Sequence, residues 1–372
     1  MTKRSSAITI RDVARAAGVS VATVSRYINK NAPVSDDLSQ RIQEIMDAFN
    51  YVPQATARHL AMRRKNAIGL LLTNIQNHFF APLLTGIEEV VRAHGYNLLV
   101  ATCHPDMREG SQLPLGMHNT DGLLAFADSL DEDDIRQFYD REFPLVLIHR
   151  TPANDLAIPF VTVENKAATR HLVEHLITVH GRSRIILMGG PEQQEDSYWR
   201  EVGYKAALSA NGIAYDLALV LRGSFQRAIA YANLKAFLAD PHHPPFDAIF
   251  AGDDDAAIGV YDALKEAGLH IPDEVSVVGF DDSQLSQFLT PPLTTVRAPT
   301  AQVGRSAAEQ LFRLLAGEAP EREILHPTEL VIRRSCGCQV QANPYEDVTL
   351  PHITSGRLFS EGTSPEVADH HE

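Results

Sequence analysis

The chain has 372 residues, of which 44% are hydrophobic and 22% charged, and its formal net charge is −14 at pH 7. It is long enough for two or three domains, and it contains no run of eighteen apolar residues that could span a membrane. It starts without the apolar stretch of a secretory signal and has three cysteines (Cys103, Cys336 and Cys338), so we expect a cytoplasmic protein without a disulfide framework.

The first predicted element is a pair of short amphipathic helices within residues 9–28, TIRDVARAAGVSVATVSRYI. Thr9 can cap the first helix, and Asp12, three residues later, can complete a capping box. Gly18 supplies the permissive backbone that a tight turn between helices requires. The apolar residues that recur at helical spacing in the first helix are Val13, Ala14 and Ala17.

The second helix of the pair presents one face to a core and another to solvent. Ser20 can cap it, and Val24 and Ile28 lie one turn apart, so they face inward. The outer side then carries Val21, Ala22, Ser25, Arg26 and Asn29. This motif can place a helix in the DNA major groove, although the spacing alone fits an ordinary helical hairpin equally well.

A third helix and a short helical segment follow. Ser35 can cap the third helix, whose apolar stripe consists of Leu38, Ile42, Ile45 and Phe49. Pro53 ends this helix and suits the first turn of another over residues 54–61, which is too short to be stable alone. We expect that segment to fold only on a surface that completes it, and we expect residues 62–66 to form a basic linker.

Positive charge is concentrated in this N-terminal part. Residues 1–66 carry eleven Lys and Arg against five Asp and Glu, a net of +6, so the rest of the chain carries −20. A basic module on an acidic body is typical of a protein in which one module contacts phosphate groups while the body is repelled from the duplex. The charge distribution therefore favours DNA binding over a plain helical hairpin.

From residue 67 the pattern changes to alternating strands and helices. Apolar runs predict buried strands at 68–72, 97–101, 121–127, 145–148, 185–188, 248–251 and 275–280. Helical stretches fall near 80–95, 131–141, 165–180, 196–211, 226–239, 254–268 and 300–317. Such alternation indicates parallel sheets covered on both faces, and about 270 residues are too many for one sheet. We therefore predict two α/β lobes with a ligand site in the cleft between them.

These patterns divide the chain into four parts. We assign residues 1–50 to a helix-turn-helix domain, 51–66 to a short helix and linker, 67–343 to the two-lobed domain, and 344–372 to a tail. The tail is polar and aperiodic, which is typical of a disordered segment.

Several longer motifs resemble those of the LacI/GalR family of bacterial transcription regulators, from about Ile8 to Cys338. In chain order they are TIRDVARAAGVSVATVSRYIN (9–29), NYVPQATARHLA (50–61), NHFFAPLLTGIEE (77–89), DGLLAF (121–126), GGP (189–191), REVGYKAAL (200–208), FAGDDDAAIGVYDALKEAGLHIPDEVSVVGFDD (250–282) and LTPPLTTVRAP (289–299). The resemblance implies an N-terminal all-α helix-turn-helix domain plus an α/β two-lobed periplasmic-binding-protein-like effector domain, in a homodimer.

The resemblance also implies that the second helix enters the major groove. Val21, Ala22 and Arg26 would meet base edges, and Arg26 could pair with a guanine, worth roughly 1–3 kcal/mol of discrimination. Val21 and Ala22 could read only shape and thymine methyl groups, and core packing is the alternative for Val21. The other residues assigned to DNA are Ser20, Thr23, Ser25 and Asn29, mostly on phosphates, and Thr9.

Residues 54–61 match the hinge helix of the family, which orders on DNA when two subunits pair. Leu60 occupies the position of a leucine wedged into the minor groove, where unstacking costs a few kcal/mol and the bent DNA meets more protein. Ala57 would flank it, and Tyr51 would contact the DNA backbone. Gln54 stands where relatives often have Asn, and local packing is the alternative for Leu60.

In the family, the effector binds in the cleft between the lobes. By position, the residues that would line it are Phe79, Phe80, Arg200, Phe225, Asp253 and Asp281. Carboxylates accept hydrogen bonds from sugar hydroxyls, a guanidinium donates in a fixed fork, and aromatic faces pack on the apolar faces of sugar rings. His149, where several relatives have Asp, is either a ligand contact or a packed histidine.

We predict neither a metal site nor a cofactor. The run Asp253-Asp254-Asp255 has no His or Cys at ligand spacing, and Asp253 stands where most relatives have Asn. Cys336-Gly337-Cys338 is a single C-x-C without a second pair, so it is not assigned to zinc. The segment 105–121 is shorter than usual in the family, which implies a reduced or absent second helix in the first lobe. The tail lacks heptad leucines, which favours a dimer over a tetramer.

Together these features predict a sequence-specific DNA-binding transcriptional regulator. We expect a repressor of carbohydrate-related genes whose affinity for a palindromic double-stranded DNA operator is controlled by a small sugar-like effector. The alternatives are a cytoplasmic sugar-binding protein without a DNA role, which the basic N-terminal part opposes, and an enzyme on an α/β fold. The common catalytic and nucleotide-binding motifs of such enzymes are missing from the sequence, so we do not expect an enzyme.

Overall fold

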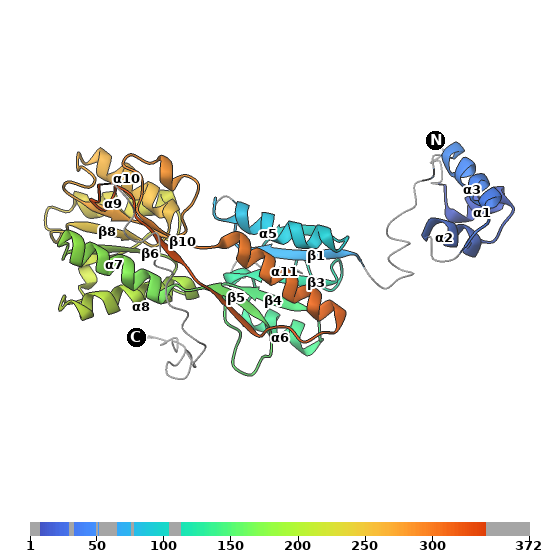
Figure 1. Ribbon diagram of the computed structural model, residues 1–372, viewed down its shortest axis with the longest axis horizontal. Helices are drawn as coiled ribbons and strands as arrows, with labels where there is room; N and C mark the ends of the chain where they lie inside the picture. The colour runs from blue at the N-terminus through green and yellow to red at the C-terminus, as the bar shows by residue number, and fades with distance from the viewer. Residues whose placement is uncertain are drawn as a thin grey trace, which may run out of the picture.

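The computed structural model describes residues 8–29, 33–49, 51, 65–75, 78–103 and 113–339. These residues form a small helical unit, the head, and a two-lobed α/β unit, the body (Figure 1). The predicted hinge segment 54–61 and the tail 344–372 lie outside the described residues. None of the helices in the described ranges is long and apolar enough to cross a membrane.

The head consists of α1 (Ile10–Ala17), α2 (Val21–Asn29) and α3 (Asp36–Ala48). The capping box predicted for α1 is confirmed, because the Asp12 carboxylate accepts from the Thr9 N–H at 3.0 Å and from the Thr9 hydroxyl at 2.7 Å. Gly18 follows α1 with a φ of +67°, a left-handed conformation that glycine adopts without strain. The Ser20 hydroxyl accepts from the Thr23 N–H at 3.1 Å and so caps α2.

Side chains from all three helices form the core of the head. The buried ones are Val13, Ala14, Ala17, Val24, Ile42 and Met46. The apolar stripe expected on α3 is correct at Ile42 but wrong at Phe49, which follows the end of the helix and is 38% exposed. Met46, one turn after Ile42, takes the place in the core that we expected for Phe49.

The first lobe is built on a parallel six-stranded sheet with the strand order β11-β5-β4-β3-β1-β2. The strands are β1 (Ala67–Leu72), β2 (Asn97–Thr102), β3 (Gly122–Phe126), β4 (Leu145–Ile148), β5 (Phe160–Val163) and β11 (Glu323–His326). The helices are α5 (Phe80–Ala93), η2 (Ala127–Ser129), α6 (Glu132–Asp140) and α11 (Thr300–Ala316). Leu124 belongs to the same core cluster as Leu311 of α11, whereas the adjacent Leu123 belongs to the cluster of Phe138 in α6. Both faces of the sheet are therefore covered, as expected.

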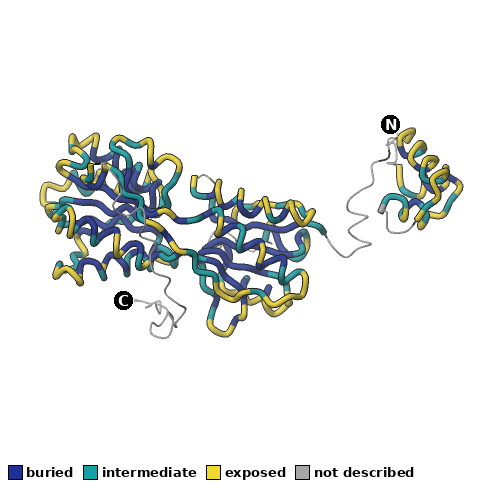
Figure 2. Tube along the Cα trace, viewed as in Figure 1, coloured by how far each residue is buried: buried dark blue, intermediate teal, exposed yellow. Residues whose placement is uncertain are grey.

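The second lobe has a parallel four-stranded sheet with the order β7-β6-β8-β9. Its strands are β6 (Ile185–Gly189), β7 (Val220–Arg222), β8 (Ala248–Ala251) and β9 (Ser276–Val278). Its helices are α7 (Lys166–His180), α8 (Glu195–Ala210), η3 (Leu217–Leu219), α9 (Arg227–Ala239), α10 (Asp254–Glu266) and η4 (Ser286–Phe288). Leu172 of α7 and Tyr204 of α8 pack in one core cluster, and Leu234 of α9 and Val260 of α10 pack in another. The buried trace follows the sheets of both lobes (Figure 2).

Three connections join the lobes, between β5 and α7, between β9 and α11, and between β11 and β12 (Glu329–Val331). β12 pairs in antiparallel fashion with β10 (Thr295–Arg297). The Glu164 N–H donates to the His326 carbonyl at 2.9 Å, so two of these connections are hydrogen-bonded to each other. A narrow, multi-stranded connection of this kind suits a hinge between two lobes.

The structure departs from the sequence-based expectation at a few strands. β2, expected to be buried, is an edge strand, and its Leu99 and Val100 are 37% and 42% exposed. The short strands β5, β7, β10, β11 and β12 were not predicted, because each of them contains a hydroxyl or charged side chain that interrupts its apolar run. The predicted alternation of strands and helices in two lobes is confirmed.

Candidate functional site

The outward face of α2 presents few polar groups. Val21 is 41% exposed, and Ala22 and Arg26 are also exposed, so the core of the head does not use Val21. Ser25 is half-buried on the same helix. An exposed guanidinium beside two apolar side chains is thus available for contact with another molecule.

The other residues assigned to DNA contact are placed by local structure. Thr9 is tied to Asp12 in the capping box, and the Ser20 and Thr23 hydroxyl groups are 2.9 Å apart at the start of α2. Tyr51 is half-buried against the core of the head. Asn29 is the last residue of α2, with a side chain outside the described part of the structure, and Gln54, Ala57 and Leu60 lie outside the described residues altogether.

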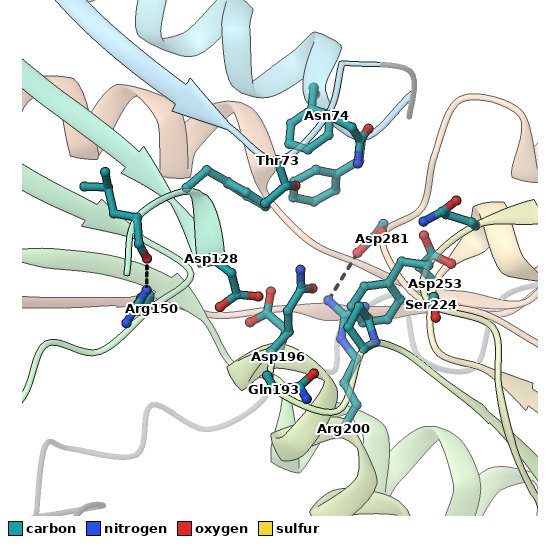
Figure 3. Close-up of a pocket in the computed structure, with 18 of the residues that line it drawn as sticks. Thr73, Asn74, Asp128, Arg150, Gln193, Asp196, Arg200, Ser224, Asp253 and Asp281 are labelled. Carbon is teal, nitrogen blue, oxygen red and sulfur yellow. Dashed lines mark hydrogen bonds and ion pairs between the residues drawn. The ribbon is translucent and has the colours of Figure 1, made fainter. Parts of the chain in front are cut away.

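A cavity of about 500 Å³ lies between the two lobes of the body (Figure 3). Its lining comes from both sheets, at the edge where the parallel strands end. The residues that follow strand ends there include Thr73 after β1, Asp128 after β3, Ser224 after β7, Asp253 after β8 and Asp281 after β9. The predicted position of the ligand site, beyond the carboxyl ends of the strands, therefore coincides with a real cavity.

Strained backbone is concentrated at the same strand ends. The non-glycine residues there with φ between +42° and +106° are Ala127, His149, Ser224, Phe225, Asp281 and Asp282. Each such residue costs of the order of 1–3 kcal/mol and persists only where its surroundings fix it, most often at functional sites. The strain thus supports the cleft as the functional part of the body.

Arg200 of α8 is held beside the cavity by three acceptors. Its Nε donates to Asn165 Oδ1 at 2.9 Å, its Nη1 to the Gly252 carbonyl at 2.5 Å, and its Nη2 to Asp281 Oδ1 at 3.4 Å. Its guanidinium carbon lies 3.7 Å from the ring centroid of Phe280. Protein groups alone therefore fix the orientation of the guanidinium, which lowers the ordering cost of binding a ligand.

The carboxylates around Arg200 differ in their affinity for protons. Burial raises the pKa of Asp281 well above its usual value; Arg200 opposes this effect, and the nearby carboxylates of Asp253 and Asp254 reinforce it. Burial acts in the same direction on Asp196, but His149 and Arg200 outweigh it and lower the pKa of Asp196. Of Asp196 and Asp281, Asp196 is thus the carboxylate that stays ionised more readily.

Asp196 also connects the two lobes. One of its oxygens, Oδ2, lies 2.8 Å from Nδ1 of His149, which follows β4 in the first lobe. The other, Oδ1, accepts from the Asn165 amide at 2.8 Å. Asp196 lines the cavity, whereas His149 is not among the lining residues and its side chain is only 1% exposed. The structure therefore places His149 behind the wall of the cavity, as a partner of Asp196.

The acidic run in the second lobe is engaged in local hydrogen bonds. Asp253 caps α10 by accepting from the Ala256 N–H at 2.8 Å. Asp254 is buried and accepts from the Thr295 hydroxyl at 2.7 Å, and Asp255 accepts from the Arg227 N–H at 2.9 Å. These hydrogen bonds explain the acidic run as the start of α10. Of the three aspartates, only Asp253 lines the cavity.

Aromatic rings line the cavity from both lobes. A Cβ atom at Gly190 would lie 2.2 Å from Cζ of Phe225, so glycine at this position lets the tip of the ring approach the backbone closely. On the first lobe, Phe79, Phe80 and Phe126 form a cluster with ring centroids 5.1–5.7 Å apart. Such apolar walls around a few fixed polar groups are typical of small-molecule sites.

The structure brings the expected lining residues Phe79, Phe80, Arg200, Phe225, Asp253 and Asp281 together in one cavity. It also adds lining residues that the sequence did not single out, among them Thr73, Asn74, Asp128, Arg150, Gln193, Gln194, Asp196 and Ser224 (Figure 3). One signal was present for Asp196, because it precedes Arg200 by one helical turn and shares a face of α8 with it.

Two family models match the chain. The model described as bacterial regulatory proteins, lacI family, matches residues 9–54, and the model of a periplasmic binding protein-like domain matches residues 173–336. The probable HTH-type transcriptional repressor ExuR of Bacillus subtilis (strain 168) is 31% identical over 334 residues, which cover 88% of this chain and 98% of that protein. The ribose operon repressor of Escherichia coli (strain K12) is 31% identical over 333 residues, with the same coverage.

Solved structures of similar proteins match most of the chain. A lac repressor dimer bound to operator and the anti-inducer ONPF matches with a TM-score of 0.73 and 25% identity, over 89% of this chain and 99% of that one. A complex of the transcriptional regulator CelR with cellobiose matches with a TM-score of 0.64 and 27% identity, over 88% and 99%. The head and the two-lobed body therefore occur together in these proteins in the same order.

Proposed function

The chain belongs to the LacI family of bacterial regulatory proteins, and from this membership we propose that it is a homodimeric transcriptional repressor whose affinity for its DNA operator is controlled by a small, uncharged sugar. Similar proteins are named as repressors, and one was solved as a dimer on its operator. The observation that carries the ligand half of the proposal is the fixed guanidinium of Arg200 among carboxylates in the inter-lobe cavity.

The head is the operator-reading part in this proposal. Arg26 reads a guanine in the major groove, and Val21 and Ala22 contact thymine methyl groups, because they are the exposed side chains on the outward face of α2. Two apolar reading positions leave part of the specificity to DNA shape and to the minor groove. We assign that part to Leu60 of the hinge segment, by its position in the family pattern.

The charges around the cavity favour an uncharged ligand. The charged residues that line it are Asp128, Asp131, Glu132, Asp196, Asp253 and Asp281 on the acidic side and Arg150 and Arg200 on the basic side. Even when Asp281, with its raised pKa, holds a proton, the carboxylates outnumber the guanidinium groups and would repel a phosphate or a sugar acid. Sugar hydroxyls can both donate to the carboxylates and accept from Arg200, and the apolar face of a sugar ring can pack on Phe79 and Phe225. Among similar proteins, one is named for the ribose operon and one was solved with cellobiose.

Ligand control requires that the two lobes have more than one arrangement. Side-chain contacts hold the lobes together, between Asp196 and His149 and between Glu195 and Thr151, whose N–H donates to Glu195 at 2.6 Å and whose hydroxyl donates to it at 2.7 Å. A sugar that contacts residues of both lobes would bind one arrangement better and shift the population toward it. In the dimer, that shift would displace the first lobes and with them the two hinge segments.

The experiment that tests the ligand half is a thermal-shift screen of neutral mono- and disaccharides together with their phosphates. A ligand at a hundred times its Kd stabilises the folded state by about 2.7 kcal/mol, so a true effector should raise the unfolding midpoint clearly. We expect the response from a neutral sugar and expect Arg200→Lys, which keeps the charge but not the fork, to lose it. A response to phosphorylated sugars alone would contradict the proposal.

The alternative of a sugar-binding protein without a DNA role is tested on the same preparation. Selection of duplexes from a random pool by the full-length protein should enrich a palindromic sequence. Failure to enrich any sequence would favour the alternative. We propose no catalytic activity. The sugar identified in the thermal-shift screen should therefore be recovered unchanged after long incubation with the protein.

A further inference from the structure

Four potential metal ligands meet at the C-terminal end of α7, away from the residues that line the cleft. His175 and His180 come from α7, and Cys336 and Cys338 come from the loop after β12. One ligand atom from each residue lies within 4.8 Å of the others. His175 and Cys336 are buried, and the other two are half-buried. Two distant parts of the chain thus converge on a compact cluster of two imidazoles and two thiols.

Three distances within this cluster match those of a tetrahedral site. His175 Nε2 and His180 Nε2 are 3.2 Å apart, and the Cys338 sulfur lies 3.6 Å from the first and 3.4 Å from the second. A tetrahedral zinc ion with usual bond lengths would separate its ligands by roughly 3.3 Å for two nitrogens and about 3.6 Å for a sulfur and a nitrogen. We propose that His175, His180, Cys336 and Cys338 bind one Zn²⁺ ion.

The surroundings of Cys336 support this assignment. The Thr294 hydroxyl donates to the Cys336 sulfur at 3.2 Å, and the Ser276 hydroxyl donates to the Cys336 carbonyl at 2.8 Å. A hydrogen bond to the sulfur stabilises a thiolate, and such outer-shell partners are regular features of metal sites. The ligand loop is therefore fixed on the second lobe independently of the ion.

A glycine at position 337, between the two cysteines, is consistent with one metal site shared by all four side chains. Its φ is +112°, and a Cβ atom there would lie 3.1 Å from Nδ1 of His180. A side chain at this position would therefore be strained and would press on the imidazole of His180. The glycine lets both flanking cysteines approach the two histidines of α7.

The ligand set favours zinc and a structural role. Thiolate and imidazole ligands in tetrahedral S₂N₂ geometry are typical of zinc, and four protein ligands leave no open position for a substrate. The ion would join the last turn of α7 to the chain segment that follows β12, and so fix the end of the body on the second lobe. This role does not depend on the proposed sugar or operator.

Metal content of the untagged, full-length protein, purified under reducing conditions, tests the proposal. Elemental analysis should find one zinc per chain, and a mercurial thiol reagent should release that zinc to an indicator dye. Protein that carries no zinc and takes up none when zinc is added would overturn the proposal, as would iron in its place. A Cys336–Cys338 disulfide in the intact protein, detected as the loss of two hydrogens in mass, would also overturn it.

Variants locate the ion. Cys338→Ser and His180→Ala should each abolish stoichiometric zinc, whereas His171→Ala, which removes an exposed histidine on the same helix, should retain it. Cobalt bound to the wild type should show the thiolate-to-metal charge-transfer band and the intense visible bands of a tetrahedral site. Because this spectrum is measured on the wild type, it tests the site even if a variant fails to fold. Zinc retained at full stoichiometry in Cys338→Ser would place the ion elsewhere and overturn the assignment.

Discussion

His149 of the first lobe and Asp196 of the second lobe meet across the base of the cleft, with Nδ1 of the histidine 2.8 Å from Oδ2 of the carboxylate. Their side chains are 1% and 13% exposed, so water screens this contact only weakly. Asp196 at the same time lines the cavity in which we place the effector. One carboxylate therefore belongs both to the contact between the lobes and to the candidate ligand site.

The first prediction concerns this contact. A double-mutant cycle with His149→Gln and Asp196→Asn should give a coupling energy above about 1 kcal/mol in urea unfolding, because the two groups are in close contact and little exposed to water. The exposed pair Arg136 and Asp155, whose side chains are 48% and 62% exposed, is the control and should couple by less than about 1 kcal/mol. Equal coupling in the two cycles would show that the inter-lobe contact is no stronger than a surface ion pair.

The second prediction is a pH dependence of stability. Burial raises the pKa of Asp254 from 3.8 to about 7, although Thr295 and the Ser283 N–H donate hydrogen bonds to it. Between about pH 4 and about pH 7 the folded state holds a proton that the unfolded state releases, so this group lowers stability by up to about 1.4 kcal/mol per pH unit as the pH rises.

Asp254→Asn removes this titration. The unfolding free energy of the wild type, relative to that of Asp254→Asn, should therefore fall between about pH 5 and about pH 7. Chemical denaturation of both proteins at each pH measures the difference. A difference that is independent of pH would mean that Asp254 has the same protonation state in the folded and unfolded chains.

The third prediction concerns the aromatic wall of the cavity. Gly190→Ala should displace the Phe225 ring, since the added Cβ would lie 2.2 Å from it. It should therefore lower the affinity for the sugar identified by thermal shift. Phe225→Ala should lower the affinity for the same sugar. The double variant should lose little more affinity than either single variant, because both changes remove the same contact of the Phe225 ring with the sugar. Isothermal titration measures the three affinities. If the losses of affinity in the two single variants add up in the double variant, Gly190 does not act through the Phe225 ring and the prediction is wrong.

The fourth prediction concerns base reading by the head. Arg26→Ala should cost about 1–3 kcal/mol, or roughly 5- to 150-fold, in affinity for the selected operator and should relax the preference at one base pair. Arg15→Ala removes the same charge from α1, where the side chain is 81% exposed, and should leave the base preference unchanged. Identical base preferences for both variants would remove Arg26 from the reading set.

The fifth prediction concerns the hinge segment. Leu60→Ala should weaken binding to the selected operator while leaving non-specific, salt-sensitive binding largely intact, because a wedge in the minor groove acts only on the correctly bent site. Gel shifts on operator and on random duplex measure both. Equal losses on the two duplexes would contradict a wedge at Leu60.

Local signals in the sequence were enough to predict the head. The capping box of Thr9 and Asp12 and the turn at Gly18 depend on residues within one turn of helix, so their spacing alone specifies them. The expectation failed at Phe49, because the helical period continues in the sequence beyond the residue where α3 ends. Element ends depend on packing that periodicity does not contain.

Groups that meet only in the folded chain were harder to predict. The lining of the cleft could be inferred for Arg200 and Asp281 through the family pattern, but Asp196 acts with His149 from the other lobe, and no spacing links them. The same limit explains the cysteines, because the C-x-C pair has no second pair nearby in sequence. Its partners on α7 lie more than 150 residues earlier, and only the fold brings them together.

Ligand control of operator binding is tested by the affinity of the full-length protein for its selected operator, measured by fluorescence anisotropy with and without a saturating amount of the sugar found in the screen. We predict that the sugar changes operator affinity at least about tenfold, a coupling of about 1.4 kcal/mol, in the wild type and not in Arg200→Lys. A sugar that binds in the cleft yet leaves operator affinity unchanged would contradict control of the operator affinity by the ligand.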